Sequence, residues 1–341
     1  MTLAEYDFDL PAGAIAQAPP ETRDAARLLV IDRERGALAD RQVVELPGLL
    51  RPGDCLVVND SRVIPARVLA EDAGGRPVEL LFLEEETAGR WRALVRPGRR
   101  CRPGATLAVA AARLEVVAVL PDGARLVQRH DGTVEDLLGA HGLPPLPPYI
   151  ARHAKPAPED WERYQTVYAR EPGSVAAPTA GLHLSDALLA SLRARGVELQ
   201  AVTLHVGPAT FRPLTASSLE AHTLPPERAT ISAATAAAIS AARRQGRRVV
   251  AVGTTVVRTL ESAAGEDGRV APLDGHATAT IRPGHRFRAV DALVTNFHLP
   301  RSSLLVLVGA FAGRELILAA YRHAVGAGYR FYSYGDATLI Q

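Results

Sequence analysis

The chain has 341 residues, a formal net charge of +2, 47% hydrophobic residues and two cysteines. Such a length can bury the cores of two domains. Cys55 and Cys101 are too few to hold an iron–sulfur cluster or to build a disulfide framework, so we expect polar rather than radical chemistry in a reducing cytoplasm. We expect no membrane span and no signal peptide, because no apolar run is long enough and the first residues lack the pattern.

Lysine is nearly absent, and Lys155 is the single one in the sequence. A phosphate-binding loop of the Gly-x-x-x-x-Gly-Lys type is therefore excluded. Since Lys155 lies in a Pro-rich turn, Schiff-base catalysis is not expected either. Arginine carries the basic charge, which makes runs of arginine a weak sign of nucleic-acid binding in this chain.

The first 61 residues contain strand-like runs at 27–31 and 54–59 around a helix-prone piece. The sequence then changes to short β-type runs separated by Gly- and Pro-containing turns at hairpin spacing. These runs are 63–69, 78–84, 91–95, 114–119 and 125–128. They predict an antiparallel, barrel-like domain over residues 62–148.

From residue 149 onward strands alternate with helices, which is typical of an α/β layer. The predicted fold class is therefore α/β (α+β). Its main domain is discontinuous, formed by residues 1–61 and 149–341, and the β-domain of residues 62–148 is inserted into it.

Two segments, 176–183 and 203–211, combine small residues, hydroxyls and one imidazole each, with almost no charge. Such composition lets backbone approach a ligand closely while a few polar atoms orient it. The first segment precedes a helix for which Ser185 is the predicted N-cap. The second begins within the last residues of a predicted strand at 197–206. His205 therefore lies at the carboxyl end of that strand, where open α/β sheets bind ligands.

Two further segments have the same character. A predicted strand at 249–253 runs into a helix that opens with Thr254 and Thr255, and Arg258 follows one turn later. This predicts a seat for an anion such as a carboxylate, although a plain Thr cap with a solvated Arg fits the sequence as well. Asn296 and His298 follow a predicted strand at 292–295.

Several motifs resemble the S-adenosylmethionine:tRNA ribosyltransferase-isomerase family of queuosine biosynthesis. The resemblance extends from Phe8-Asp9-Leu10-Pro11 to Tyr334-Gly335-Asp336-Ala337. Between these ends it includes Asn59-Asp60-Ser61-Arg62-Val63, Pro65-Ala66-Arg67, Pro178-Thr179-Ala180-Gly181-Leu182-His183, Thr203-Leu204-His205-Val206-Gly207, Arg258-Thr259-Leu260-Glu261-Ser262 and Thr295-Asn296-Phe297-His298-Leu299-Pro300.

The resemblance implies an enzyme that transfers and isomerises the ribosyl moiety of S-adenosylmethionine. The acceptor would be 7-aminomethyl-7-deazaguanine at the wobble position of a tRNA, and adenine and methionine would leave. It implies S-adenosylmethionine as co-substrate, no metal and no redox cofactor. We expect the tRNA anticodon arm as partner, no membrane partner, and a monomer.

We assign expected site residues on the matched motifs. Neutral imidazoles suit acid–base work near neutral pH, so His183 or His205 is expected to be the base. The expected catalytic set is His183, His205, Asp336, Asp60 and Glu220. The set expected to bind the co-substrate is Pro178, Thr179, Gly181, Gly207, Thr254, Thr255, Arg258, Asn296 and His298.

For the RNA, the turn at 96–102 holds four arginines and no acid. It predicts a phosphate clamp or, equally, a solvated hairpin tip. The expected RNA contacts are Arg62, Arg67, Arg99 and Arg100.

Two segments depart from the family pattern. Pro225 stands where members carry a second imidazole, and residues 278–284 lack the usual acid and aromatic rings. Aromatic rings favour stacking on a flipped base, so acceptor recognition is what these changes affect. Two other functions stay open: a related transferase with a different acceptor, and a non-catalytic RNA-binding module.

Overall fold

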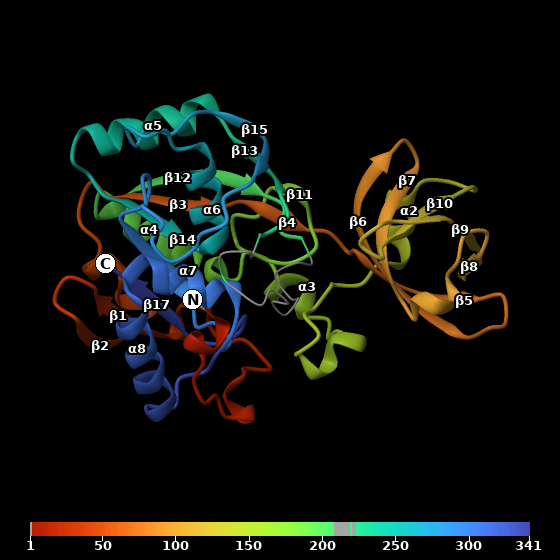
Figure 1. Cartoon of the computed structure of the whole chain (residues 1–341), viewed down its shortest axis with the longest axis horizontal. Coiled ribbons are helices and arrows are strands. Elements are labelled where there is room, and N and C mark those ends of the chain that lie inside the picture. The colour runs from red at the N-terminus through yellow and green to blue at the C-terminus, as the bar shows by residue number, and fades with distance from the viewer. Residues whose placement is uncertain (1, 208–218, 220–222) are drawn as a thin grey trace.

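A computed structural model describes residues 2–207, 219 and 223–341. Figure 1 shows a larger part built around one twisted sheet and a smaller, separate part at the other end of the molecule. The large sheet has nine strands, in the order β15 (Leu273–Ala277), β13 (Glu227–Ile231), β12 (Glu198–Leu204), β3 (Cys55–Asn59), β14 (Val249–Val252), β16 (Ala292–Asn296), β17 (Ala337–Ile340), β1 (Arg27–Asp32) and β2 (Ala37–Gln42).

The four central strands of this sheet are all parallel to one another: β12 pairs with β3, β3 with β14, and β14 with β16. Their carboxyl ends therefore meet at one edge. The outer strands β13 and β15 pair antiparallel, β17 pairs antiparallel with β16, and β1 pairs parallel with β17. The shared edge brings residues from 59, 204, 253 and 296 together, although they lie far apart in the sequence.

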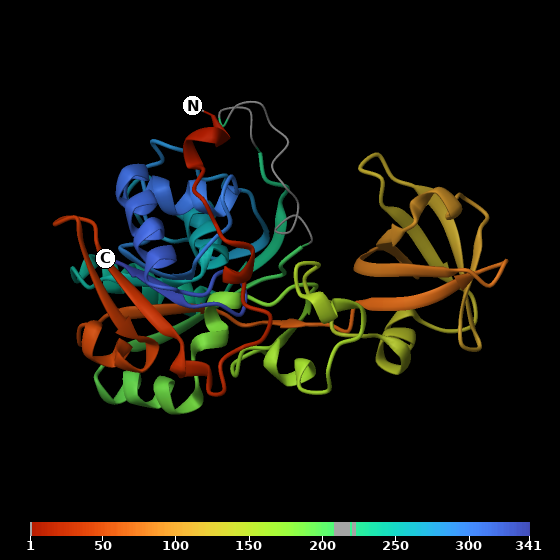
Figure 2. The same ribbon diagram turned by 90° about the horizontal axis from the view of Figure 1, so that it is seen from below.

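Helices cover both faces of the sheet (Figure 2). One face carries α5 (Ala233–Arg244), α6 (Thr254–Ala263), α7 (Ser303–Ala312) and α8 (Arg314–Gly326). The other carries α1 (Leu46–Leu49) and α4 (Asp186–Ala194). The predicted Ser185 cap is confirmed, because its hydroxyl accepts a hydrogen bond from the Leu188 N–H at 3.0 Å.

The smaller part is a closed antiparallel barrel. Its strands follow the order β10 (Arg125–Arg129), β7 (Arg90–Arg96), β6 (Pro77–Thr87), β5 (Arg67–Asp72), β8 (Thr106–Val109) and β9 (Ala112–Val119). Apolar side chains such as Phe82, Leu114 and Val116 fill it, and α2 (Val134–His141) packs Leu137 and Leu138 against this core.

Shorter elements connect the two parts. β4 (Ser61–Val63) pairs parallel with β11 (Glu171–Ser174), and α3 (Asp160–Arg163) lies between the barrel and the large sheet in sequence. Short 3-10 turns cover Leu3–Tyr6, Ala12–Ala14, Arg23–Ala25, Val43–Glu45, Gly98–Arg100, Ala151–Ala154 and Thr179–His183.

The predicted α/β fold with a β-barrel is confirmed, with local differences. The strand expected at 63–69 is divided, because Pro65 lacks the N–H that a continuous ladder needs. Strand β8 was not predicted, since its four residues are too few to show a clear alternating pattern. Within the segment 176–183, residues 179–183 form a 3-10 turn before α4.

Among the described residues, no single helix is long and apolar enough to cross a membrane. α7 and α8 pass that test only as a pair, and they meet at a bend of 115°.

Candidate functional site

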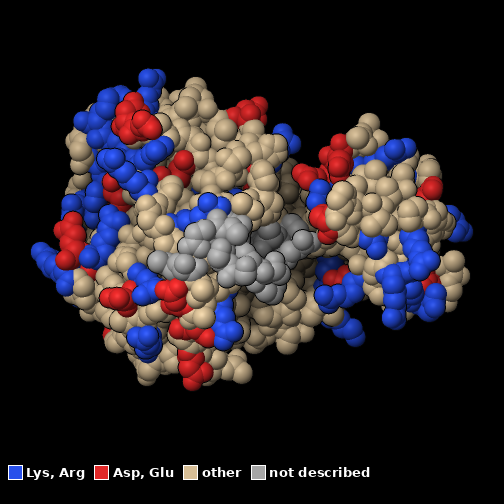
Figure 3. All heavy atoms as spheres, viewed as in Figure 1, with Lys and Arg blue, Asp and Glu red and all other residues tan. Residues whose placement is uncertain are grey.

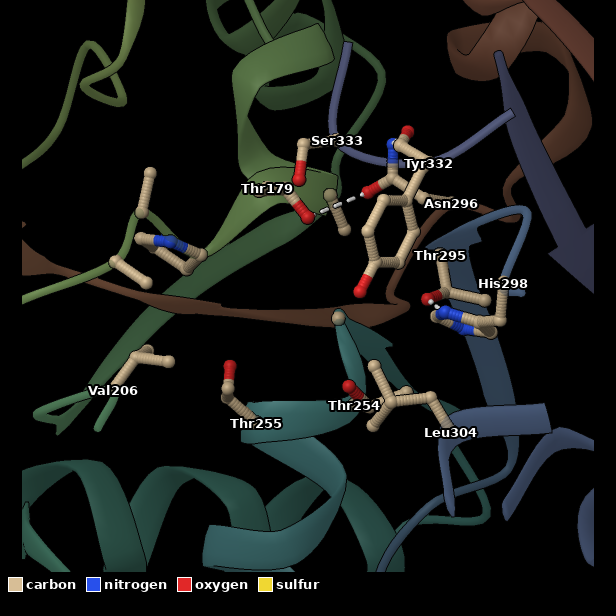
Figure 4. Close-up of a pocket in the computed structure, with 15 residues that line it drawn as sticks. Thr179, Val206, Thr254, Thr255, Thr295, Asn296, His298, Leu304, Tyr332 and Ser333 are labelled. Carbon is tan, nitrogen blue, oxygen red and sulfur yellow. Dashed lines mark hydrogen bonds between the residues drawn. The ribbon is translucent and has the colours of Figure 1, made fainter. Parts of the chain in front are cut away.

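A pocket opens at the shared carboxyl edge of the parallel strands (Figure 4). It encloses about 550 Å³ of space, part of it open to solvent. Its walls come from the 3-10 turn at 179–183, the start of α6, the end of β16 and the segment at 332–333. Of the residues predicted to bind the co-substrate, the pocket is lined by Pro178, Thr179, Thr254, Thr255, Asn296 and His298.

Asn296 ties three walls of the pocket together. Its Oδ1 accepts a hydrogen bond from the Thr179 hydroxyl at 3.0 Å, and its Nδ2 donates to the Tyr332 carbonyl at 3.1 Å. A carbonyl can only accept, so this contact fixes the orientation of the amide. The second hydrogen on Nδ2 then points to Nε2 of His183, 3.0 Å away.

His183 therefore uses the Nε2 lone pair to hold Asn296, and this argues against its expected role as base. The ring is buried, and desolvation, followed by Arg330 and Arg23, lowers the pKa of His183 to about 4. It is neutral at neutral pH. In this geometry His183 positions the amide of Asn296 and does not line the pocket itself.

His298 is the single imidazole of the described residues that lines this pocket. Its Nε2 lies 3.2 Å from the Thr295 hydroxyl, and Figure 4 shows the two side chains facing each other at the end of β16. Burial lowers the pKa of His298 to about 3. The ring is therefore neutral at neutral pH.

His205 lies on a different face. β12 ends at Leu204, and His205 and Val206 follow it directly. Val206 lines the pocket, whereas the His205 ring contacts Ser61, with 3.1 Å between Nδ1 and Oγ. Desolvation lowers the pKa of His205, with Arg228 adding to the effect. His183, His205 and His298, all expected to be site residues, thus lie in three different positions.

The start of α6 faces the pocket, as predicted. Gly253 precedes it at φ +93, a conformation that other residues rarely adopt, and a Cβ there would lie 3.4 Å from the Ala180 side chain. No side chain caps this helix end, so the first N–H groups are available to an anion. Thr255 Oγ1 also accepts a hydrogen bond from Asn59 Nδ2 at 3.3 Å, which anchors the helix to β3.

Arg258 does not reach the pocket, which revises its expected role. Its guanidinium is buried and forms an ion pair with Glu227, and it donates to the carbonyls of Ala279 at 3.1 Å and Pro225 at 3.1 Å. Glu227 in turn accepts from the Gly207 N–H at 2.9 Å. These contacts occupy the donors that were expected to hold a carboxylate, so Arg258 and Gly207 organise the chain around the pocket.

Comparisons with known proteins point in one direction. Residues 3–340 match the family described as queuosine biosynthesis protein. A protein from Anaeromyxobacter dehalogenans named S-adenosylmethionine:tRNA ribosyltransferase-isomerase is 55% identical over 345 residues, covering 100% of this chain and 99% of that protein. A protein of the same name from Moorella thermoacetica is 52% identical, with 100% of both chains covered.

The chain belongs to the queuosine biosynthesis family. The crystal structure of an S-adenosylmethionine tRNA ribosyltransferase from Thermotoga maritima is also similar, with a TM-score of 0.57 and 34% identity over 99% of this chain and 100% of that one. The resemblance inferred from the sequence motifs is confirmed.

In this member of the queuosine biosynthesis family, the two described acids expected to be catalytic lie off the pocket. Asp60 accepts from the Thr203 hydroxyl at 2.6 Å and from Arg170 at 2.8 Å, and burial raises the pKa of its carboxyl. Asp336 accepts from the backbone N–H groups of Arg27 at 2.9 Å and Arg330 at 2.7 Å. Both carboxylates therefore hold backbone or neighbouring side chains. Glu220 lies outside the described residues.

Gly181 is a packing position. A Cβ there would lie 2.0 Å from the Tyr168 hydroxyl, so the glycine permits the close approach of the two segments.

The four arginines expected to contact RNA differ sharply in accessibility. Arg62 and Arg99 are exposed and have no side-chain partner among the described residues. Arg67 is 3% exposed and pairs with Glu79 at 2.9 Å, so it cannot reach a phosphate. Arg100 bonds Asp72 at 3.2 Å and also donates to the Pro77 carbonyl, which makes it a brace for its turn. Arg67 and Arg100 are thus structural.

Sequence reasoning missed the aromatic side of the pocket. Tyr332 has φ +75, which is uncommon outside glycine, and its ring lies in the pocket (Figure 4). Tyr149 packs against it with 4.1 Å between ring centroids, and the Tyr149 hydroxyl bonds Ser333. No motif in the sequence signals a tyrosine with positive φ. Among the described residues, no three His, Cys, Asp or Glu side chains are grouped as a metal site would need.

Proposed function

We propose that the chain transfers and isomerises the ribosyl moiety of S-adenosylmethionine onto 7-aminomethyl-7-deazaguanine at the wobble position of a tRNA. The products are epoxyqueuosine in the tRNA, adenine and methionine. The observation that carries the proposal is the pocket at the sheet edge, formed by the matched motifs in a chain with full-length relatives of that name. The enzyme works in the cytoplasm, where tRNA is found.

Three features of the pocket suit S-adenosylmethionine. The uncapped start of α6, with the hydroxyls of Thr254 and Thr255, suits the methionine carboxylate, because helix N-termini favour anions. The ring of Tyr332 offers a π face to the positive sulfonium. Asn296, bonded to the Thr179 hydroxyl and the Tyr332 carbonyl, holds the 3-10 turn and Tyr332 in place beside β16.

The chemistry follows from the charge of the sulfonium, which makes the C5′ protons acidic. A base removes one of them, the ribose ring opens with loss of adenine, the acceptor amine attacks, and epoxide closure releases methionine. No metal or redox cofactor is needed for these steps. His298 is the base in this proposal, because it is neutral and lines the pocket. Burial disfavours its protonated form, and the nearby methionine carboxylate would offset that penalty.

The segments that depart from the family pattern are held in place by backbone atoms. Pro225 and Ala279 offer their carbonyls to Arg258, and the N–H groups of Thr278 and Ala279 donate to Ser262 at 3.0 and 2.9 Å. A change of side chain in these segments leaves such anchors intact. The departures are therefore compatible with the same acceptor.

The barrel is suited to hold the RNA backbone through one of its ends. At the end of β7 and in the turn after it, three exposed arginines have no side-chain partner among the described residues: Arg96, Arg99 and Arg102. Arg100 and Arg125 bond to other residues and brace the turn. Glu79 of β6 pairs with Arg96, so this end of β6 lies beside the basic turn. The acidic run Glu84–Glu86 lies toward the other end of β6, about six residues or roughly 20 Å along the strand from Glu79. In Figure 3 many basic side chains of the barrel gather on its lower part and an acidic cluster lies at its upper left, with a few residues of either charge elsewhere on this face.

One assay tests the proposed function. The protein is incubated with S-adenosylmethionine and a tRNA that carries 7-aminomethyl-7-deazaguanine, and both adenine release and RNA mass are measured. We expect one adenine to be released for each RNA molecule that gains the mass of the transferred group. A tRNA that keeps guanine at that position should give neither adenine nor a change in mass. Binding of S-adenosylmethionine without turnover on the modified tRNA would favour a different acceptor. RNA binding without any adenine release from either RNA would favour a binding module.

A further inference from the structure

Ser61 and Ser174 form a buried chain of hydroxyls that ends on His205. Both serines are fully buried. Their hydroxyls bond each other, and Ser61 Oγ lies 3.1 Å from His205 Nδ1. At the other end, Ser174 Oγ accepts from the Val206 N–H at 2.8 Å.

The position of this chain is fixed by backbone. Asn59 Oδ1 accepts from the N–H groups of Ser61 at 3.1 Å and Leu204 at 3.0 Å, which ties β4 to the end of β12. Gly173 adopts φ +145, and a Cβ there would lie 2.7 Å from Nδ1 of His205. The imidazole therefore packs directly on the backbone of Gly173, a place that no larger residue could share.

Only one direction of hydrogen bonding along the two hydroxyls gives each hydroxyl hydrogen an acceptor. In the described part of the molecule, the Ser174 hydroxyl has one oxygen to donate to, Ser61 Oγ. The Ser61 hydrogen must then go to Nδ1 of His205. If Nδ1 carried the proton instead, a buried hydroxyl hydrogen would lack an acceptor, which costs about 1–3 kcal/mol.

We propose that Ser61 and Ser174 are positioning residues that fix His205 as the neutral tautomer with its proton on Nε2. In the described residues Nε2 has no protein partner, so it presents an N–H to the substrate. Resting on the proposed function, the acceptor is an oxygen of the RNA, because β4 leads from Ser61 directly to the exposed Arg62 and on to the barrel. His205 thus donates a hydrogen bond, and it does not serve as the base.

The tautomer is measured on the protein alone. Nitrogen-15 NMR of histidine-labelled protein reports which ring nitrogen carries hydrogen, and the spectrum of His205→Gln assigns the signals. We expect Nε2–H in the native chain and a mixture of tautomers in Ser61→Ala. Ser61→Thr, which keeps the hydroxyl, retains Nε2–H. Ser240→Ala removes a buried hydroxyl elsewhere and is the matched control.

Turnover supplies the second readout. Glutamine places an N–H close to the position of Nε2, so His205→Gln should retain most single-turnover adenine release. His205→Ala should lose about 10²-fold, as for a positioned catalytic group. A proton on Nδ1 in the native chain, an unchanged tautomer in Ser61→Ala, or equal rates for the Gln and Ala variants would each overturn the proposal. The NMR result is independent of whether the proposed reaction is correct.

Discussion

The large sheet and the barrel differ in where their polar side chains lie, buried in the one and exposed in the other. At the carboxyl edge of the sheet, buried polar side chains bond to neighbouring side chains, as Asn59 does to Thr255, Asn296 to Thr179 and His298 to Thr295. In the described barrel strands, Arg67 is the single buried polar residue, and the charges lie outside. Buried polar networks fix geometry, whereas exposed arginines attract phosphate. The comparison supports the proposal that the sheet sets the reaction geometry and the barrel attracts RNA.

The largest expected effect tests the sheet. His298→Ala should lower single-turnover adenine release by about 10²–10⁴-fold, the usual value of a positioned acid or base. Affinity for S-adenosylmethionine should change little, because proton transfer to His298 occurs in the transition state and does not contribute to binding in the ground state. His323→Ala, which removes an exposed imidazole bonded to Asp40, is the control. Normal turnover in His298→Ala would show that the base lies elsewhere.

Loss of Arg258 tests whether this residue organises the fold or binds substrate. Arg258→Ala leaves Glu227 buried without its partner, and breaking such a pair costs about 3–5 kcal/mol of unfolding free energy. Urea unfolding measures this cost. Arg243→Ala breaks a partly exposed pair with Asp291 and should cost about 1 kcal/mol or less. A stable Arg258→Ala protein with weakened co-substrate binding would instead restore the carboxylate seat predicted from the sequence.

Charge reversal on the barrel tests its assigned role. Arg99→Glu with Arg102→Glu should weaken tRNA binding by about tenfold or more and reduce the salt slope of log Kd by about two, as expected for two lost phosphate contacts. Affinity for S-adenosylmethionine should not change. The pair Arg35→Glu with Arg41→Glu alters net charge equally on the β1–β2 hairpin of the sheet. Equal losses in both double variants would mean that total charge, rather than the barrel turn, governs RNA binding.

The last prediction concerns pH and the buried imidazoles. Folding lowers the pKa of His183 to about 4 and of His298 to about 3, so the unfolded chain binds protons that the folded chain excludes. Stability should therefore fall as pH drops from about 6.5 toward about 4, by about 1.4 kcal/mol per pH unit for each ring. His298→Asn should flatten this slope in urea unfolding curves. A slope unchanged by His298→Asn would contradict the assigned protonation state.

The sequence predicted the elements of the site better than their contacts. Thr254 and Asn296 were placed correctly because small residues and hydroxyls at strand ends leave a local pattern. The partner of Arg258 was not predictable, since Glu227 reaches it only through the pairing of β13 beside β12. Tyr332 enters the pocket through a backbone angle that no pattern records. Positions at strand ends and before a helix start also suggested one site for His183, His205 and His298, whereas His205 contacts Ser61 and His183 holds Asn296.

The placement of β17 between β16 and β1 has a consequence for synthesis on the ribosome. The barrel has all of its strands once Arg129 has been made, and its packing helix is complete at His141. The large sheet joins β1 to β16 only through residues 337–340, which are translated some 300 residues after β1. Since domains fold as units during translation, the barrel can form early. The β1–β2 hairpin must wait for β17 before it joins the sheet, and the exposed edge of β1 is a surface for chaperones to protect.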